Sequence, residues 1–212
     1  EYGDQPDDPL KDSPFDVPVW VASAQDDPAW PSPWGPGRPG WHAECAAMAL
    51  ASFGPCVDVL AGGADLAFPH HAYQSALVTA FSDAGRFARV TFDVGTVRLD
   101  GVKMAKSLGN LVLVEDLLTG ASPEQVRLML LDRRWDEPWD YDARALAAAG
   151  ERLDRLYAAA ARPVGDAAAA TEVRRALCDD LGVSRALDLA EEAGGPVTAD
   201  LLRLLALDRG DA

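Results

Sequence analysis

The feature that most constrains the fold of this chain is an ordered series of segments between residues 57 and 92. Residues 57–60 form a short, largely apolar run typical of a buried strand, and Gly62-Gly63 follows it closely. Residues 70–82 have the pattern of a helix, and residues 87–92 again resemble a strand. A strand, a glycine turn, a helix and a second strand predict a parallel α/β sheet, in which ligands bind at the carboxyl ends of the strands.

The chain before this series is irregular. Residues 1–40 hold nine of the 15 prolines, and one short strand is expected there at residues 17–22. A long irregular segment is uncommon in a compact domain, so we expect this one to be functional or the remnant of a larger domain. Helical spacing begins at Ala43 and ends at Gly54-Pro55.

A turn at Asp100-Gly101 precedes a loop that carries Lys103 and Lys106, and beyond this lysine loop the chain is expected to become all helical. Residues 122–125 have the form of a capping box with proline at the first helical position, and residues 146–156 form part of a long amphipathic helix. Further helices are expected at residues 173–181, 183–190 and 199–207. The sequence therefore predicts a partial α/β domain over residues 1–118 and a small α-helical domain over residues 119–212.

Charge and composition narrow the class of partner. The formal net charge is −15, and no basic run is longer than Arg133-Arg134 or Arg174-Arg175, whereas nucleic-acid binders neutralise phosphates with basic patches. A polyanion such as tRNA is therefore disfavoured, although a local site for a small phosphate is compatible with the sequence. Three widely spaced cysteines give no disulfide framework and predict a reducing cytoplasm. No run of about 18 apolar residues predicts a membrane span.

Two residues are candidates for a metal site. Cys45 is expected on a helix after a Pro-Gly turn, and His70 at the start of the helix that follows the glycine pair. Zinc accepts thiolate and imidazole, and a catalytic zinc keeps one position open for substrate. A third ligand is needed, and Gln74, one turn after His70, is a poor one. The alternative is a buried cysteine and histidine with a purely structural role.

Two further segments have the composition of a nucleotide site. Gly62-Gly63 would let a backbone approach a nucleotide, and Asp65 would accept hydrogen bonds from ribose hydroxyls; the alternative is an ordinary turn. Lys103 and Lys106 lie on a loop flanked by glycines, where two ammonium groups can neutralise a triphosphate. The alternative for this loop is a solvated surface.

Two other features have structural alternatives. Trp41 follows the Gly40 turn, where its ring could stack on a ligand or pack in the core. An acidic cluster in the second half of the chain is interpreted as a solvated face; it consists of Asp136, Glu137, Asp140 and Asp142.

Three ordered motifs carry a resemblance to a known family. Residues 34–45, 62–71 and 103–110 closely resemble the class I cysteinyl-tRNA synthetases and their sister enzyme, the mycothiol biosynthesis ligase that joins cysteine to glucosaminyl-inositol. The ligase is the more similar of the two, because its Glu-Arg-Gly-Gly-Asp-Pro pattern is echoed by residues 1–6. The resemblance implies the carboxyl-terminal half of a class I Rossmann catalytic domain followed by a small α-helical bundle.

The resemblance also implies roles for individual residues. Cys45 and His70 match zinc ligands that hold the cysteine thiolate, and Trp41 matches a residue beside the bound cysteine. The positions matching those that hold ATP or the cysteinyl adenylate are Gly63, Ala64, Asp65, Val97, Lys103, Met104, Lys106 and Ser107. Lys103 and Lys106 match the catalytic lysines of the mobile Lys-Met-Ser-Lys-Ser loop. The implied reaction forms cysteinyl-AMP from cysteine and ATP, and then an amide with the amine of an amino-sugar.

Departures from the family pattern are equally informative. Ala105 and Ala64 replace serines, Asp93 stands where a histidine is usual, and Gln74 replaces the synthetase glutamate. The first catalytic half of the family is not present in the sequence, so the third zinc ligand and half of the ATP site are expected from a second chain or a longer protein. Half of a doubly wound sheet also leaves strand edges unpaired, so we expect a partner chain or a homo-oligomer.

Three functional hypotheses follow. The first is a cytoplasmic cysteine ligase that is inactive as this chain alone and active with its amino-terminal half. The second is a non-catalytic relic that serves as a binding or assembly partner, which Ala64, Asp93 and Ala105 favour. The third is cysteinyl-tRNA synthesis, which the net charge disfavours.

Overall fold

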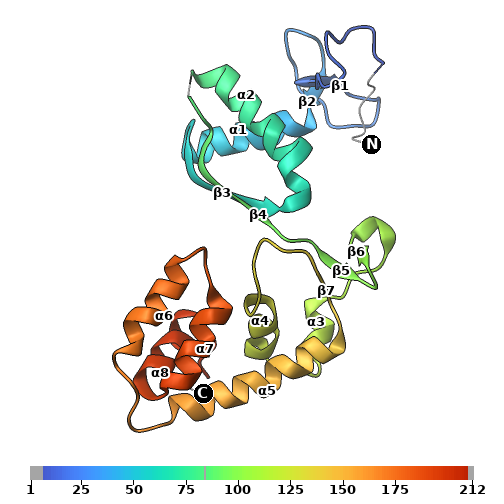
Figure 1. Ribbon diagram of the computed structural model, residues 1–212. Helices are drawn as coiled ribbons and strands as arrows, with labels where there is room; N and C mark the ends of the chain where they lie inside the picture. Colours follow the sequence, from blue (N-terminus) through green and yellow to red (C-terminus); the bar gives the residue numbers. More distant parts are fainter. Residues whose placement is uncertain (1–6, 84, 210–212) are drawn as a thin grey trace. The chain divides into compact units, whose positions relative to one another are not determined.

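The computed structural model describes residues 7–83 and 85–209, and it divides into two compact units, Glu1–Val94 and Gly95–Ala212 (Figure 1). The pattern expected at residues 1–6 lies outside the described residues. The sequence predicts that the α/β domain ends at residue 118. That domain boundary remains a prediction.

The first unit contains a parallel strand pair and two main helices. Its elements are β1 (Trp20–Ala22), β2 (Gly37–Pro39), α1 (Trp41–Phe53), β3 (Val57–Gly63), α2 (Ala72–Ser82) and β4 (Ala88–Val94). Strands β3 and β4 pair in parallel with Val59 opposite Val90, which confirms the predicted parallel sheet. Helix α1 ends at Gly54, whose φ of 78° suits glycine.

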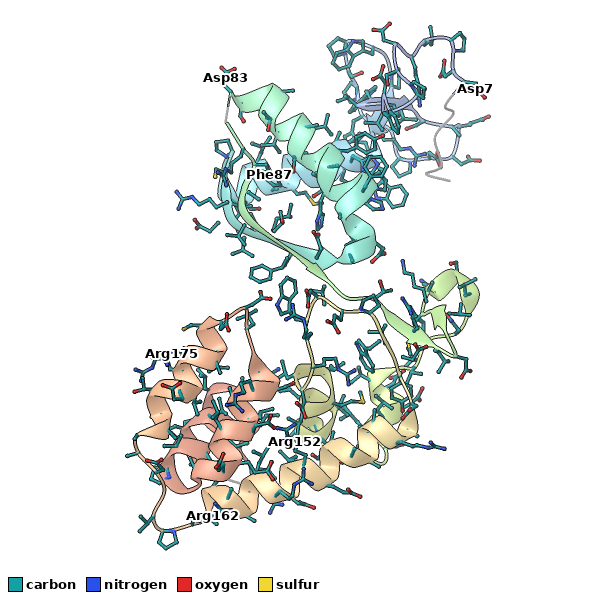
Figure 2. All side chains as sticks on the ribbon, in the orientation of Figure 1. Asp7, Asp83, Phe87, Arg152, Arg162 and Arg175 are labelled. Atoms are coloured by element: carbon teal, nitrogen blue, oxygen red, sulfur yellow. The ribbon has the colours of Figure 1, made fainter. Side chains whose placement is uncertain are left out.

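The core of this unit is small. Ala46 of α1, Val78 of α2 and Phe87 before β4 form its buried cluster, and Figure 2 labels Phe87 beside the two helices. Val59 and Val90 lie opposite each other on one face of the sheet and are 54% and 49% exposed. Side chains at alternate strand positions share a face, so this face of the strand pair is apolar and accessible to solvent in the chain as described.

The proline-rich segment is ordered by a small antiparallel pairing. Strands β1 and β2 pair with Trp20 opposite Pro39, which confirms a strand within residues 17–22. Trp30 adds a bridge to the same ribbon: its N–H donates to the Gly37 carbonyl over 2.7 Å, and the Gly37 N–H donates back over 3.0 Å. The segment is therefore a structured support for the amino end of α1.

The second unit contains a three-stranded sheet and six helices among its described residues. These elements are β5 (Val97–Leu99), β6 (Val102–Lys103), α3 (Val114–Leu117), α4 (Pro123–Leu131), β7 (Trp139–Asp140), α5 (Ala143–Ala160), α6 (Ala169–Cys178), α7 (Val183–Ala193) and α8 (Gly195–Leu204). The four helices α5 to α8 cover the helical segments predicted after residue 146, with small differences at the ends.

Strand β7 corrects the expectation that the chain beyond the lysine loop is all helical. It pairs in parallel with β5, and β5 pairs with β6 across the predicted Asp100-Gly101 turn. The Asp140 carboxylate accepts a hydrogen bond from the Gly101 N–H over 2.7 Å, and Asp142 caps α5 through the Ala145 N–H. The four acidic residues are all exposed, as expected for a solvated face, and Asp140 and Asp142 in addition hold local structure.

The helical bundle has a continuous core. The Ser122 hydroxyl accepts from the Gln125 N–H over 3.1 Å, which confirms the predicted helix cap. Leu128, Leu156 and Leu187 are fully buried and come from α4, α5 and α7. Among the helices of residues 7–83 and 85–209, none combines the length and the apolar character needed to cross a bilayer.

Candidate active site

Aromatic rings gather at the amino end of α1. The His70 ring lies 5.2 Å from the Trp41 ring and 5.1 Å from the His42 ring, measured between centroids. The His42 ring is in turn 4.8 Å from that of Tyr73, at the start of α2. His42 is buried, whereas Trp41 is 67% exposed and therefore does not belong to the core. The fold brings the predicted residues Trp41 and His70 together.

Cys45 lies one helical turn beyond this ring cluster. It follows Trp41 by four residues and His42 by three on α1, and residues with these spacings share a helix face. Because His70 contacts both rings of the first turn, Cys45 and His70 flank the same end of α1. Cys45 is a free, half-buried thiol.

Cys45 and His70 are of the residue types that bind zinc, but two ligands are too few for a zinc site. A thiolate and an imidazole are ligands that zinc prefers, and a catalytic site needs three protein ligands. Within the described parts of the chain, no group of three histidine, cysteine, aspartate or glutamate residues is placed to hold a metal. The described residues therefore offer the predicted pair, Cys45 and His70, and any third ligand would come from outside them.

The glycine pair ends β3, as predicted, and at both positions nearby side chains leave no room for a Cβ atom. A Cβ on Gly63 would meet the Asp65 carboxylate oxygen, and one on Gly62 would meet the His71 ring 2.8 Å away. The Asp65 carboxylate therefore folds back toward the end of β3 within a short helical turn, Ala64–Leu66. Ala64 and Asp65 are exposed, which leaves them accessible to a ligand.

Asp93 lies at the same end of the sheet. It is paired in register with Gly62, so its backbone is beside the glycine pair, and its side chain is half-buried. The strands are parallel, and their carboxyl ends at Gly63 and Val94 lie at one edge. A carboxylate at this edge adds negative charge where a nucleotide phosphate would otherwise be favoured.

The lysine loop belongs to the second unit. Lys103 ends β6, and Lys106 and Ser107 begin a short helical turn that Gly109 closes with a φ of 64°. The Met104 N–H donates to the Val97 carbonyl over 3.0 Å, so two of the predicted adenylate positions are joined by a backbone hydrogen bond. Lys103, Lys106 and Ser107 are exposed.

Asn110 closes this loop with its side chain. Its amide oxygen accepts from the Ala105 N–H over 2.9 Å, and its amide nitrogen donates to the Lys103 carbonyl over 3.0 Å. Both groups lie between the two lysines, so Asn110 fixes the backbone that carries them. Asn110 falls within the family motif, yet a role for it could not be assigned from spacing, because the contacts are made by the folded loop.

The candidate residues thus form two separate clusters, each within one compact unit. Trp41, Cys45, His70 and the glycine turn belong to the first unit, and Val97 with the lysine loop belongs to the second. Sequence reasoning missed His42, Tyr73 and Asn110. The three histidines within 30 residues of one another were a usable signal for the ring cluster, whereas Tyr73 carried none.

Comparison with known proteins adds the family context. The family model described as "tRNA synthetases class I (C) catalytic domain" matches residues 3–151. The chain is 44% identical over 212 residues to the L-cysteine:1D-myo-inositol 2-amino-2-deoxy-alpha-D-glucopyranoside ligase of Parafrankia sp. (strain EAN1pec), covering 94% of this chain and 48% of that protein. It is 45% identical over 183 residues to the Cysteine--tRNA ligase of Rhodospirillum rubrum, covering 84% of this chain and 40% of that protein.

A solved structure shares the fold. The Agrobacterium radiobacter K84 agnB2 LeuRS, in a ternary LeuRS-tRNA-LeuAMS complex, matches with a TM-score of 0.50 and 17% identity, over 88% of this chain and 31% of that one. The curated relatives confirm the resemblance drawn from the three motifs. This chain spans less than half the length of the two relatives named above.

Proposed function

Because this chain belongs to the class I (C) catalytic domain family of tRNA synthetases, we propose that it is part of an ATP-dependent ligase that activates cysteine as cysteinyl-AMP and transfers it to the amine of an amino-sugar. In the first step the cysteine carboxylate attacks the α-phosphorus of ATP, and pyrophosphate leaves. In the second step the amine attacks the cysteinyl carbonyl, an amide forms, and AMP leaves with the bonding electron pair.

The observation that carries the proposal is the placement of Trp41, Cys45 and His70 at one end of α1, the residues expected to bind cysteine. Zinc held by Cys45 and His70 would bind the substrate thiolate and disfavour serine, whose hydroxyl is a harder and less acidic donor. The exposed Trp41 ring would cover the bound side chain. These residues select and orient the amino acid.

The lysine loop supplies the charge for adenylation. Lys103 and Lys106 can follow the negative charge that develops on pyrophosphate as it leaves, because both ammonium groups are exposed on one short loop. Asn110 holds the loop backbone, so less ordering is needed when ATP binds. Asp65 provides an acceptor for the ribose hydroxyls.

The complete reaction is proposed for a larger assembly. The relatives extend well beyond the matched region, and the described residues offer only two candidate zinc ligands, Cys45 and His70, where a site needs at least three. We propose that the third ligand and the remaining ATP contacts come from the segment equivalent to the amino-terminal half of the relatives. The apolar face around Val59 and Val90 is the surface that such a segment would cover.

The test is cysteine-dependent exchange of pyrophosphate into ATP. The chain co-expressed with the amino-terminal half of the Parafrankia ligase should catalyse exchange, and Lys106→Ala should lower the rate about 10²- to 10³-fold, the usual loss for one stabilising group. Arg144→Ala removes an exposed cation elsewhere in the second unit and is the matched control. Exchange that is absent, or unaffected by Lys106→Ala, would support a non-catalytic relic.

One observation favours a second candidate, since a relative of 45% identity is named a Cysteine--tRNA ligase. The net charge of −15 opposes binding of a polyanion to this chain. Incubating the active assembly with [35S]cysteine, ATP and either total tRNA or an amino-sugar separates the two candidates. Radioactivity in acid-precipitable tRNA would show that tRNA, and not an amino-sugar, is the acceptor of cysteine.

A further inference from the structure

A cavity of about 960 Å³ opens beside the amino end of α1, entirely within the first unit, and Trp41 is the only one of its lining residues to which the proposed function gives a role. Its walls include Trp20, Trp30, Arg38, Trp41, His42 and Glu44. Trp30 is 54% exposed and Trp41 is 67% exposed. Large aromatic faces left accessible in a concave site are typical of ligand-binding pockets.

The backbone holds this pocket in shape. Trp30 is fixed by two hydrogen bonds to Gly37, and Trp20 lies opposite Pro39 in the β1–β2 ribbon. A Cβ on Gly37 would collide with the Trp20 indole nitrogen, and one on Gly40 would collide with the Pro18 carbonyl. The walls therefore approach one another so closely that glycine is required twice, and the pocket is preformed.

The charges in the pocket favour a cation with hydroxyl groups. Glu44, in the first turn of α1, offers a carboxylate to an ammonium group, and the tryptophan faces attract cations through their negative quadrupole. Arg38 lies 3.9 Å from the Asp27 carboxylate, which offsets its charge and leaves N–H donors for hydroxyl oxygens. A phosphate or a nucleic acid would face Glu44 and a chain of net charge −15.

We propose that this pocket binds the acceptor substrate, as a protonated primary amine carried on a polyhydroxylated ring. The inference rests on the proposed function and specifies where its second substrate binds. Trp41 connects the two sites, because it lines the pocket and its ring also contacts His70. The amine is thereby held beside the position proposed for the substrate cysteine, while Trp20 and Trp30 stack on the ring.

The test is direct binding of a simple amino-sugar to this chain without ATP or cysteine. Tryptophan fluorescence and calorimetry would compare glucosamine with glucose and N-acetylglucosamine, which keep the ring and lack the positive charge. Glucosamine should bind in a saturable way and at least about tenfold more tightly than either neutral sugar. Glu44→Gln should weaken glucosamine binding about tenfold and leave glucose binding unchanged.

Matched variants keep the result interpretable. Glu44→Gln has nearly the same shape as the parent, and Glu115→Gln removes an exposed acid from the second unit as its control. Trp30→Phe keeps an aromatic wall and should retain more binding than Trp30→Ala, with far-ultraviolet circular dichroism confirming that both variants fold. Loss of all sugar binding in Trp30→Ala with retention in Trp30→Phe would support stacking.

Several outcomes overturn the inference. These are no saturable glucosamine binding by the parent chain, equal affinity for glucosamine and glucose, or glucosamine binding that Glu44→Gln leaves unchanged. The assay is independent of adenylation. If glucosamine binding is saturable and depends on Glu44 but pyrophosphate exchange fails, the pocket assignment stands and the proposed ligase activity is rejected. If exchange succeeds but glucosamine does not bind, only the pocket assignment is rejected.

Discussion

The helices of the two compact units differ in how their apolar and charged residues are distributed. Helices α1 and α2 carry a single acidic residue, Glu44, and no lysine or arginine, and Phe53 and Phe81 at their ends are 72% and 81% exposed. Helices α5 to α8 are amphipathic, with charged residues on the solvent side and a continuous leucine-rich core. Helices that are apolar on all sides normally lie inside a larger core.

The two units differ in the size of their buried cores, which is much smaller in the first unit than in the second. The buried cluster of the first unit consists of Ala46, Val78 and Phe87, with partly buried neighbours, around a strand pair whose apolar face is accessible. Both edges of that pair are unpaired among the described strands. This arrangement agrees with a chain that spans less than half the length of the relatives compared above.

Phe87→Ala should have the largest effect, and it tests the dependence of the first unit on its small core. Phe87 is 3% exposed, and removing a buried phenylalanine ring costs about 3–5 kcal/mol of unfolding free energy. Hydrogen exchange followed by mass spectrometry should show lost protection over residues 41–94 and unchanged protection over α5 to α8. Phe81→Ala removes an exposed ring and is the control; equal effects of the two variants would contradict the assignment.

Arg152→Met should have the next largest effect, and it tests the second unit. The Arg152 guanidinium, labelled in Figure 2, donates to Asp132 over 2.7 Å and also binds Asp188, so it joins α5 to the end of α4 and to α7. Its loss should lower the unfolding free energy by about 1.5–3 kcal/mol, the range for hydrogen bonds to charged groups. Urea denaturation measures the change.

Arg203→Met is the matched control for this variant. Arg203 pairs with Asp200 within α8, and both side chains are largely exposed, so the pair should contribute about 0.2–1 kcal/mol. A loss in Arg203→Met as large as that in Arg152→Met would show that the interhelix network contributes nothing beyond an ordinary surface pair.

Asn110→Ala should have a smaller, local effect on the lysine loop. Two hydrogen bonds of about 1 kcal/mol each would be lost, which corresponds to roughly a tenfold or greater rise in the open population of the loop. Limited trypsin digestion reads this directly, since cleavage after Lys103 and Lys106 requires local opening. Asn110→Asp keeps the acceptor for the Ala105 N–H and should lie between Ala and the parent. Identical cleavage rates for the parent and the two variants would show that Asn110 does not hold the loop closed.

Asp136→Asn should have the smallest effect on stability, and this effect should disappear at acid pH. The Arg134 guanidinium donates two hydrogen bonds to Asp136, over 3.0 and 2.9 Å, and these lower the pKa of that carboxyl. The stabilisation is present above the ordinary aspartate pKa and is lost as the pH falls through the lowered folded pKa. Urea midpoints should converge for parent and variant in that acid range, and a difference that instead widens there would contradict the assignment.

The sequence by itself determined the local elements and the family of this protein. The β3–α2–β4 series, the Ser122 cap and the leucine face of α5 are set by local spacing and side-chain chemistry, so they could be predicted. The motifs around Cys45, His70 and Lys103 indicated the family for the same reason. None of these features needs a distant contact to be recognised.

Only the tertiary structure decided the remaining features, because each depends on groups far apart in sequence. Strand β7 has two residues and exists through its pairing with β5, about 40 residues earlier. The Trp20, Trp30 and Trp41 walls converge because the β1–β2 ribbon folds back on α1, and the Asn110 clamp requires the loop to be closed. Hydrogen bonds and packing between distant segments leave no local pattern in a sequence, so they become visible only when the chain is folded.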